Sequence, residues 1–144
     1  MTAKQNARLV NKDILEDRLG FKQHSRSIIF LKGSSLVLSP SVQNQYNWFD
    51  IRKPNLDFYL DTPSFKGILV IRFFDKFLVS NLEDFIKKVM PDDKFVFNKS
   101  IGPHWKFRIR KNTDSYSIYN QQNSTVSYPI KEYSVQELEK LFLY

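Results

Sequence analysis

The chain of 144 residues contains no cysteine, which excludes disulfide bonds, thiolate metal sites and a cysteine nucleophile. Glycine and proline are scarce, with 4 and 6 residues, so no low-complexity linker divides the chain. The longest apolar run, residues 67–71, ends at Arg72 and is far shorter than the ~20 residues of a membrane-spanning helix. Residues 1–10 are polar and lack the apolar segment of a secretory signal. We therefore expect a cytoplasmic protein that does not enter a membrane.

Apolar side chains, by contrast, are plentiful. Hydrophobic residues make up 42% of the chain and aromatic residues 15%, which is enough to build a core in a domain of this length. We expect residues 1–144 to form one domain. Residues 1–10 are expected to be a mobile basic arm or the first turn of a helix.

The hydrophobic periodicity predicts more strands than helices. Alternating side chains and the turns between them indicate short strands, and the stretch 104–128 reads as a three-stranded antiparallel meander. The predicted strands cover residues 27–31, 36–39, 46–52, 67–74, 77–80, 94–98, 104–111, 115–119 and 125–128.

Helices are predicted at three places. Residues 12–19 have the spacing of a short helix, Asn81 is placed to cap a second one, and residues 134–137 form a capping box that begins a final helix. Residues 55–60 fit either a strand or a helical turn. The predicted fold class is α+β: a single domain with a mainly antiparallel β-sheet and two or three short helices, including a C-terminal helix.

The charge of the chain is strongly positive. Lysine and arginine number 22 against 15 acidic residues, which gives a net charge of +7. A basic protein of this kind favours anionic partners such as nucleic acid, although a positive charge also serves solubility.

One predicted strand, residues 104–111, divides apolar from cationic side chains. Alternate residues of a strand face opposite sides, so one side carries Trp105, Phe107 and Ile109, and the other carries His104, Lys106, Arg108 and Arg110. Neighbouring side chains on one face lie ~7 Å apart, a spacing comparable to that of successive phosphates. We expect the apolar side to be core and the cationic side to meet a phosphate backbone or to remain solvated.

Residues around this strand extend the candidate site. Further cations lie before and after it, and the next predicted strand offers hydroxyl groups and an aromatic ring for phosphate and base contacts. The candidate nucleic-acid-contacting residues are Lys99, His104, Lys106, Arg108, Arg110, Lys111, Ser117 and Tyr119.

A second strand pattern suggests different chemistry. The sequence Asp50-Ile51-Arg52 on a predicted strand resembles the metal-binding half of the PD-(D/E)xK nuclease motif, except that Arg52 replaces the lysine. The resemblance implies Asp50 as a Mg²⁺ ligand and Arg52 as a charge-stabilising group, both as catalytic candidates. The other interpretation is a structural ion pair of Asp50 with Arg52 or with a neighbouring strand.

Three functions follow, in order of preference. The first is a small module that binds nucleic acid through the cationic strand, with DNA and RNA both open. The second is a protein-interaction or inhibitor module for an acidic partner, for example from a phage or mobile element. The third is a Mg²⁺-dependent nuclease. No cofactor and no resident metal site are expected, because two histidines without a ligand spacing give no zinc motif. The sequence favours a protein that is not an enzyme over one that is.

Overall fold

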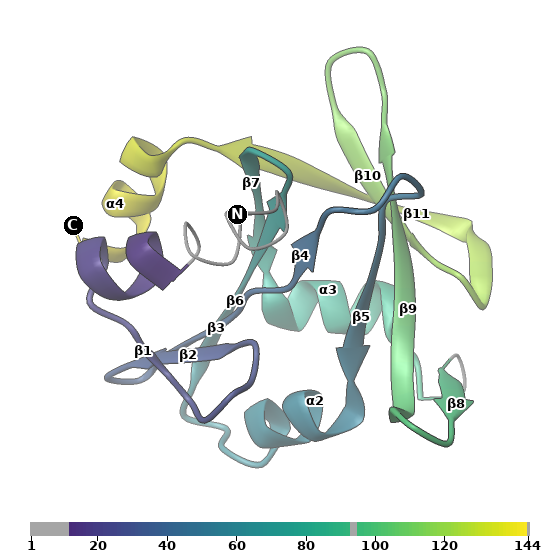
Figure 1. The fold of residues 1–144 in the computed structure, drawn as a ribbon, viewed down its shortest axis with the longest axis horizontal. Helices are drawn as coiled ribbons and strands as arrows, with labels where there is room; N and C mark the ends of the chain where they lie inside the picture. Colours follow the sequence, from purple (N-terminus) through teal and green to yellow (C-terminus); the bar gives the residue numbers. More distant parts are fainter. Residues whose placement is uncertain (1–11, 93–94, 144) are drawn as a thin grey trace.

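The computed structural model describes residues 12–92 and 95–143, so the predicted arm of residues 1–10 lies outside the described residues (Figure 1). Its helical elements are η1 Asp13–Arg18, a π-helix, followed by α2 Lys53–Leu60, α3 Leu82–Val89 and α4 Val135–Leu143. Its strands are β1 Lys22–Gln23, β2 Ile29–Lys32, β3 Ser35–Leu38, β4 Ser41–Val42, β5 Trp48–Arg52, β6 Lys66–Phe73, β7 Lys76–Asn81, β8 Val96–Asn98, β9 Gly102–Lys111, β10 Tyr116–Asn120 and β11 Asn123–Tyr133.

The strands of the described residues form one continuous sheet. Its main path runs β1-β2-β3-β6-β7-β11-β10-β9-β5, with β4 beside β6 and β8 beside β9. The pairs β3–β6 and β4–β6 are parallel and all the others are antiparallel. The α+β class, the mainly antiparallel sheet and the C-terminal helix predicted from the sequence are therefore confirmed.

Strand β11 joins the two halves of this sheet and is much longer than predicted. Its residues up to Ile130 pair with β10, where Pro129 lies opposite Ser117, and its last residues, Lys131 to Tyr133, pair with β7. The sequence suggested a strand that ends at Tyr128. That end was wrong because the partner of the last residues lies about fifty residues earlier in the chain, and local periodicity carries no signal of such a pairing.

The larger hydrophobic core lies on the side of the sheet that α3 covers (Figure 1). Its centre is aromatic: the Phe107 ring of β9 lies 5.1 Å from Phe85 of α3 and 5.1 Å from Phe49 of β5, measured between ring centroids. All three side chains are buried. Helix α3 therefore fixes β5 and β9 relative to β6 and β7, which are distant in the sheet order.

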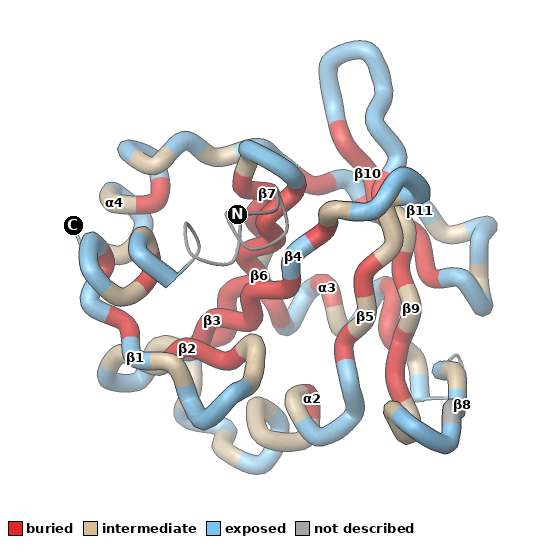
Figure 2. The backbone as a smooth tube through the Cα atoms, viewed as in Figure 1, coloured by how far each residue is buried: buried red, intermediate tan, exposed pale blue. Residues whose placement is uncertain are grey.

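A second core lies on the other side of β2, β3, β6 and β7, beneath η1 and α4. Leu15 of η1, Leu19 directly after η1 and Leu138 of α4 are fully buried there. The Phe21 and Phe142 rings meet edge to face with centroids 5.0 Å apart. Figure 2 shows the result: buried residues follow β3, β6 and β7 between the two cores.

The helix ends agree with the predicted caps. The Asn81 side chain accepts a hydrogen bond from the Asp84 N–H at 2.9 Å, and Ser134 and Glu137 exchange the two hydrogen bonds of a capping box. The ambiguous residues 55–60 are helical, in α2, whose first turn holds Pro54, where a missing N–H breaks no intrahelical hydrogen bond. None of the described helices is long and apolar enough to cross a membrane.

The hairpin between β6 and β7 contains an unfavourable backbone conformation. Phe73 pairs with Lys76, so the loop consists of Phe74 and Asp75 rather than the predicted Asp75 and Lys76. Phe74 has φ of 56°, in the region where a bulky side chain is strained.

We expect Phe74→Gly to raise the free energy of unfolding by about 0.5–1 kcal/mol, because glycine adopts this conformation without strain. Phe74 is 45% exposed, so removal of its ring loses only the buried part of its surface, and we expect the released backbone strain to exceed this loss. Chemical denaturation of both proteins measures the difference. A decrease of the same size would show that the Phe74 ring contributes more through its contact with Phe73 than the turn loses through strain.

Candidate nucleic-acid interface

Strand β9 divides its side chains between the core and the outside, as the sequence predicted. Trp105, Phe107 and Ile109 are 3%, 0% and 1% exposed and belong to the larger core. On the opposite side Lys106 and Arg108 are partly exposed and Arg110 is exposed. We call this side of β5, β9 and β10 the outer face.

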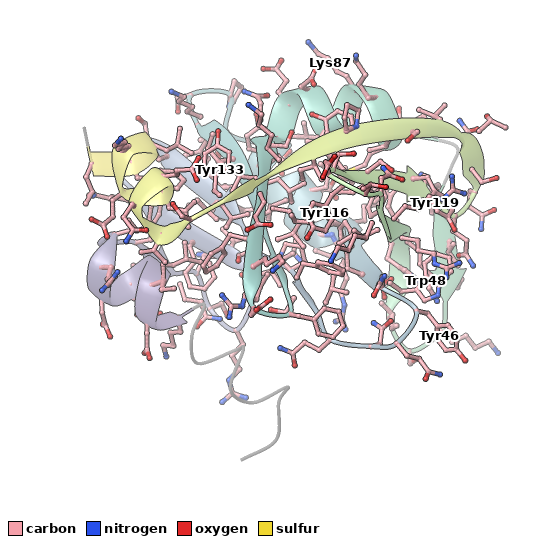
Figure 3. All side chains as sticks on the ribbon, turned by 90° about the horizontal axis from the view of Figure 1, so that it is seen from above. Tyr46, Trp48, Lys87, Tyr116, Tyr119 and Tyr133 are labelled. Carbon is pink, nitrogen blue, oxygen red and sulfur yellow. The ribbon has the colours of Figure 1, made fainter. Side chains whose placement is uncertain are left out.

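The three strands align aromatic residues with these cations. In the register of the sheet, Arg108 lies between Trp48 of β5 and Tyr119 of β10. The Trp48 and Tyr119 rings meet at a centroid distance of 6.3 Å. Figure 3 shows both residues, together with Tyr46, at one end of the molecule, and Tyr133 at the other. The outer face is therefore a small aromatic surface crossed by the cations of β9.

Cation–π contacts hold the charged groups over these rings. The Lys106 Nζ and the Arg108 guanidinium carbon each lie 5.4 Å from the Trp48 ring centroid. The Arg110 guanidinium carbon lies 4.2 Å from the Tyr119 centroid. Each such contact contributes roughly 0.5–1 kcal/mol at an exposed site. The rings thus limit the positions of three long side chains without using their N–H groups as hydrogen-bond donors.

The cations of β9 form no salt bridge within the described residues. The ion pairs there are Arg18–Glu139, Lys53–Asp57, Lys76–Asp75 and Lys87–Glu83. Asp50 of β5 lies opposite Lys106 in the register, but it forms no ion pair with Lys106 or with any other described residue. The alternative interpretation of Asp50 as a structural ion pair is thus not supported.

The loop before β5 is fastened to β9. The Asn44 Oδ1 accepts hydrogen bonds from the Tyr46 and Trp48 N–H groups, each at 3.1 Å. Asn47 has φ of 61°, and its carbonyl accepts the Ile109 N–H at 3.0 Å. These contacts give Tyr46 a defined place beside the outer face.

Three of the candidate residues are less accessible than predicted. His104, Ser117 and Tyr119 are 4%, 8% and 8% exposed, so burial disfavours their expected direct contacts with a ligand. His104 lies between Arg52 of β5 and Val96 of β8 in the register and contacts the Gly102 carbonyl through Nδ1 at 3.0 Å.

Tyr119 and Ser117 lie close to Arg110. Its guanidinium stands over the Tyr119 ring, and Ser117 is opposite Arg110 in the register. Tyr119 therefore supports a cation instead of offering a free ring. The alternation of side chains along β10 indicated the face on which Ser117 and Tyr119 lie. It could not show that residues of neighbouring β-strands cover them.

Three further cationic residues lie around Lys106, Arg108 and Arg110. Lys111 ends β9 and is exposed, Lys99 is exposed in the turn before β9, and Arg52 is exposed at the end of β5. The structure therefore brings Lys106, Arg108 and Arg110 together and leaves these three side chains at the margins.

The surroundings of the catalytic candidates Asp50 and Arg52 do not support a metal site. Asp50 is partly exposed on the outer face, and the described residues contain no group of three or more histidine, aspartate or glutamate side chains arranged to hold a metal ion. The nuclease interpretation remains a prediction without structural support.

A hydrogen-bonded cluster lies apart from this face, at the start of α3. The Tyr128 hydroxyl of β11 donates to the Asp84 carboxylate at 2.8 Å and contacts the Ser80 hydroxyl. Burial raises the pKa of Tyr128, the Asp84 charge raises it further, and the Ser80 hydrogen bond acts in the opposite direction.

Because the pKa of Tyr128 is raised, the free energy of unfolding decreases at high pH. The folded state holds the phenol proton more tightly than the unfolded state, so this contribution is complete below pH ~10 and is lost as the pH rises through the folded-state pKa. We expect Tyr128→Phe to cost about 1 kcal/mol at neutral pH through the lost hydrogen bond, and to lose less stability than the wild type above pH 10. Urea denaturation at pH 7 and above pH 10 measures both, and equal alkaline losses in the two proteins would contradict the assignment.

Sequence reasoning did not identify Asn44, Tyr46 or Trp48 as part of the cationic site. Alternation along β5 places Trp48 and Asp50 on one face, but only the pairing of β5 with β9 places that face beside Arg108. Comparison of the chain with known protein families, with curated proteins and with solved structures finds no match. The function therefore has to be argued from the outer face itself.

Proposed function

We propose that this protein binds nucleic acid through its outer face, with Lys106, Arg108 and Arg110 as the phosphate contacts. The observation that carries the proposal is the row formed by these three cations. They lie on alternate positions of one rigid strand, about 7 Å apart, and none of them takes part in a salt bridge within the described residues. The net charge of +7 supports the same kind of partner.

Arg108 is the best oriented of the three. Its Nε donates to the Tyr46 carbonyl at 3.0 Å, so the side chain is held by a hydrogen bond that does not use its two terminal nitrogens. A guanidinium has five N–H donors in a fixed plane, and the four terminal ones suit two oxygens of one phosphate. Lys106 and Arg110 would act on the neighbouring phosphates.

A binding measurement at two salt concentrations tests the proposal. Fluorescence anisotropy with labelled single- and double-stranded DNA and RNA should show binding at ~50 mM salt that weakens about 20- to 40-fold at ~200 mM, as expected for three neutralised phosphates. No binding at the lower salt, or binding that is insensitive to salt, would contradict the proposal. Shortened product that depends on added Mg²⁺ would instead support the nuclease.

A further inference from the structure

Tyr46 lies beside the row of Lys106, Arg108 and Arg110. Among the described residues its ring contacts no other ring and no cation, and the residue is 55% exposed. Trp48 differs, because two cations stand over its ring. Tyr46 is therefore a residue beside the outer face whose ring can receive a flat, apolar ligand group.

Hydrogen bonds hold the backbone of Tyr46 close to the proposed phosphate contacts. The Tyr46 carbonyl accepts the Arg108 Nε hydrogen bond at 3.0 Å, and its N–H donates to the Asn44 side chain. The following residue, Asn47, donates through Nδ2 to the Ile109 carbonyl at 3.4 Å and accepts the Ile109 N–H. Because the loop is already ordered, binding a ligand here costs little conformational entropy.

The geometry distinguishes between single- and double-stranded ligands. In a duplex the base faces are covered by their stacked neighbours, and only the base edges and the backbone can be contacted. A single strand exposes base faces, which stack on aromatic side chains while cations follow the phosphates. A ring next to a straight row of cations suits the second arrangement.

We infer that the ligand of the outer face is a single-stranded nucleic acid. One unpaired base stacks on Tyr46, and the adjoining phosphates meet Lys106, Arg108 and Arg110. The inference rests on the proposed function and adds the strandedness of the ligand. Trp48 and Tyr119 act indirectly, by holding the cations in place.

The test compares the affinity for single strands with that for a duplex. Labelled oligo(dT) and oligo(U) of about 12 nucleotides, within the site sizes of known single-strand binders, and a duplex of equal length are titrated with the full chain at ~50 mM salt. We expect either single strand to bind at least tenfold more tightly than the duplex. Tyr46→Ala should weaken single-strand binding by roughly 5- to 100-fold, the effect of one lost stacking contact, and leave duplex binding unchanged.

Two variants serve as matched controls. Tyr46→Phe keeps the ring and should bind oligo(dT) like the wild type. Phe97→Ala removes another exposed aromatic ring, 69% exposed, which lies opposite Pro103 and so on the other face of the sheet, and it should also bind normally.

The outcomes are separable. Duplex binding equal to or tighter than single-strand binding, an unchanged affinity in Tyr46→Ala, or an equal loss in Phe97→Ala would overturn the inference while the proposed function stands. Absence of binding to every nucleic acid would overturn the proposed function itself.

Discussion

Replacing Lys106, Arg108 and Arg110 together by glutamine should lower the affinity for nucleic acid by about 100-fold or more at low salt. Three contacts of ~1 kcal/mol each account for this size. The slope of log affinity against log salt should also fall by about 2 to 3, because each neutralised phosphate contributes 0.7–0.9. Glutamine retains part of the aliphatic stem over Trp48 and Tyr119, so packing of the outer face is preserved better than with alanine.

A variant with the same loss of charge separates the cationic row from net charge. Lys66, Lys88 and Lys140 are exposed, lie on β6, α3 and α4, and belong to none of the described salt bridges. Their joint replacement by glutamine should reduce affinity only slightly. Similar losses in the two triple variants would mean that overall charge, and not the row on β9, governs binding. Thermal unfolding of both variants checks that each remains folded.

The largest expected effect on stability comes from the inward side of the same strand. Phe107 is 0% exposed and lies between Phe49 and Phe85. Phe107→Ala should lower the free energy of unfolding by about 3–5 kcal/mol, through lost burial and the cavity left behind. For a protein of typical stability, about 5–15 kcal/mol, that is a large part of the total.

Urea denaturation measures this loss, with Phe97→Ala as the comparison. Phe97 is 69% exposed, so its removal should change the free energy of unfolding by less than about 0.5 kcal/mol. Phe107→Leu should fall between the two, because leucine fills part of the cavity. A Phe107→Ala protein no less stable than Phe97→Ala would contradict the placement of β9 against α3.

The stability prediction bears on the site because the two faces of β9 are inseparable. Alternation places Phe107 directly between Lys106 and Arg108, so the packing of this ring holds the strand that displays the cations. Experiments on binding should therefore change outward side chains, and experiments on folding the inward ones.

The sequence alone determined the direction of the side chains along β9 and the starts of the helices α3 and α4. A strand with apolar residues at every second position can bury only one face, so Trp105 and Phe107 face the core in any fold that uses this strand. The caps at Asn81 and Ser134 depend on hydrogen bonds to residues three positions away. Both are local properties, and local properties can be read from one sequence.

Only the tertiary structure decided what surrounds the cations. The pairing of β5 with β9 joins Trp48 to Arg108, and the Arg108 side chain reaches the Tyr46 carbonyl, although about sixty residues separate them in the chain. The same is true of Tyr119, whose burial under Arg110 depends on cross-strand neighbours. Such contacts follow from the packing of whole strands on a shared core, whose free energy is spread over many residues and leaves no local pattern.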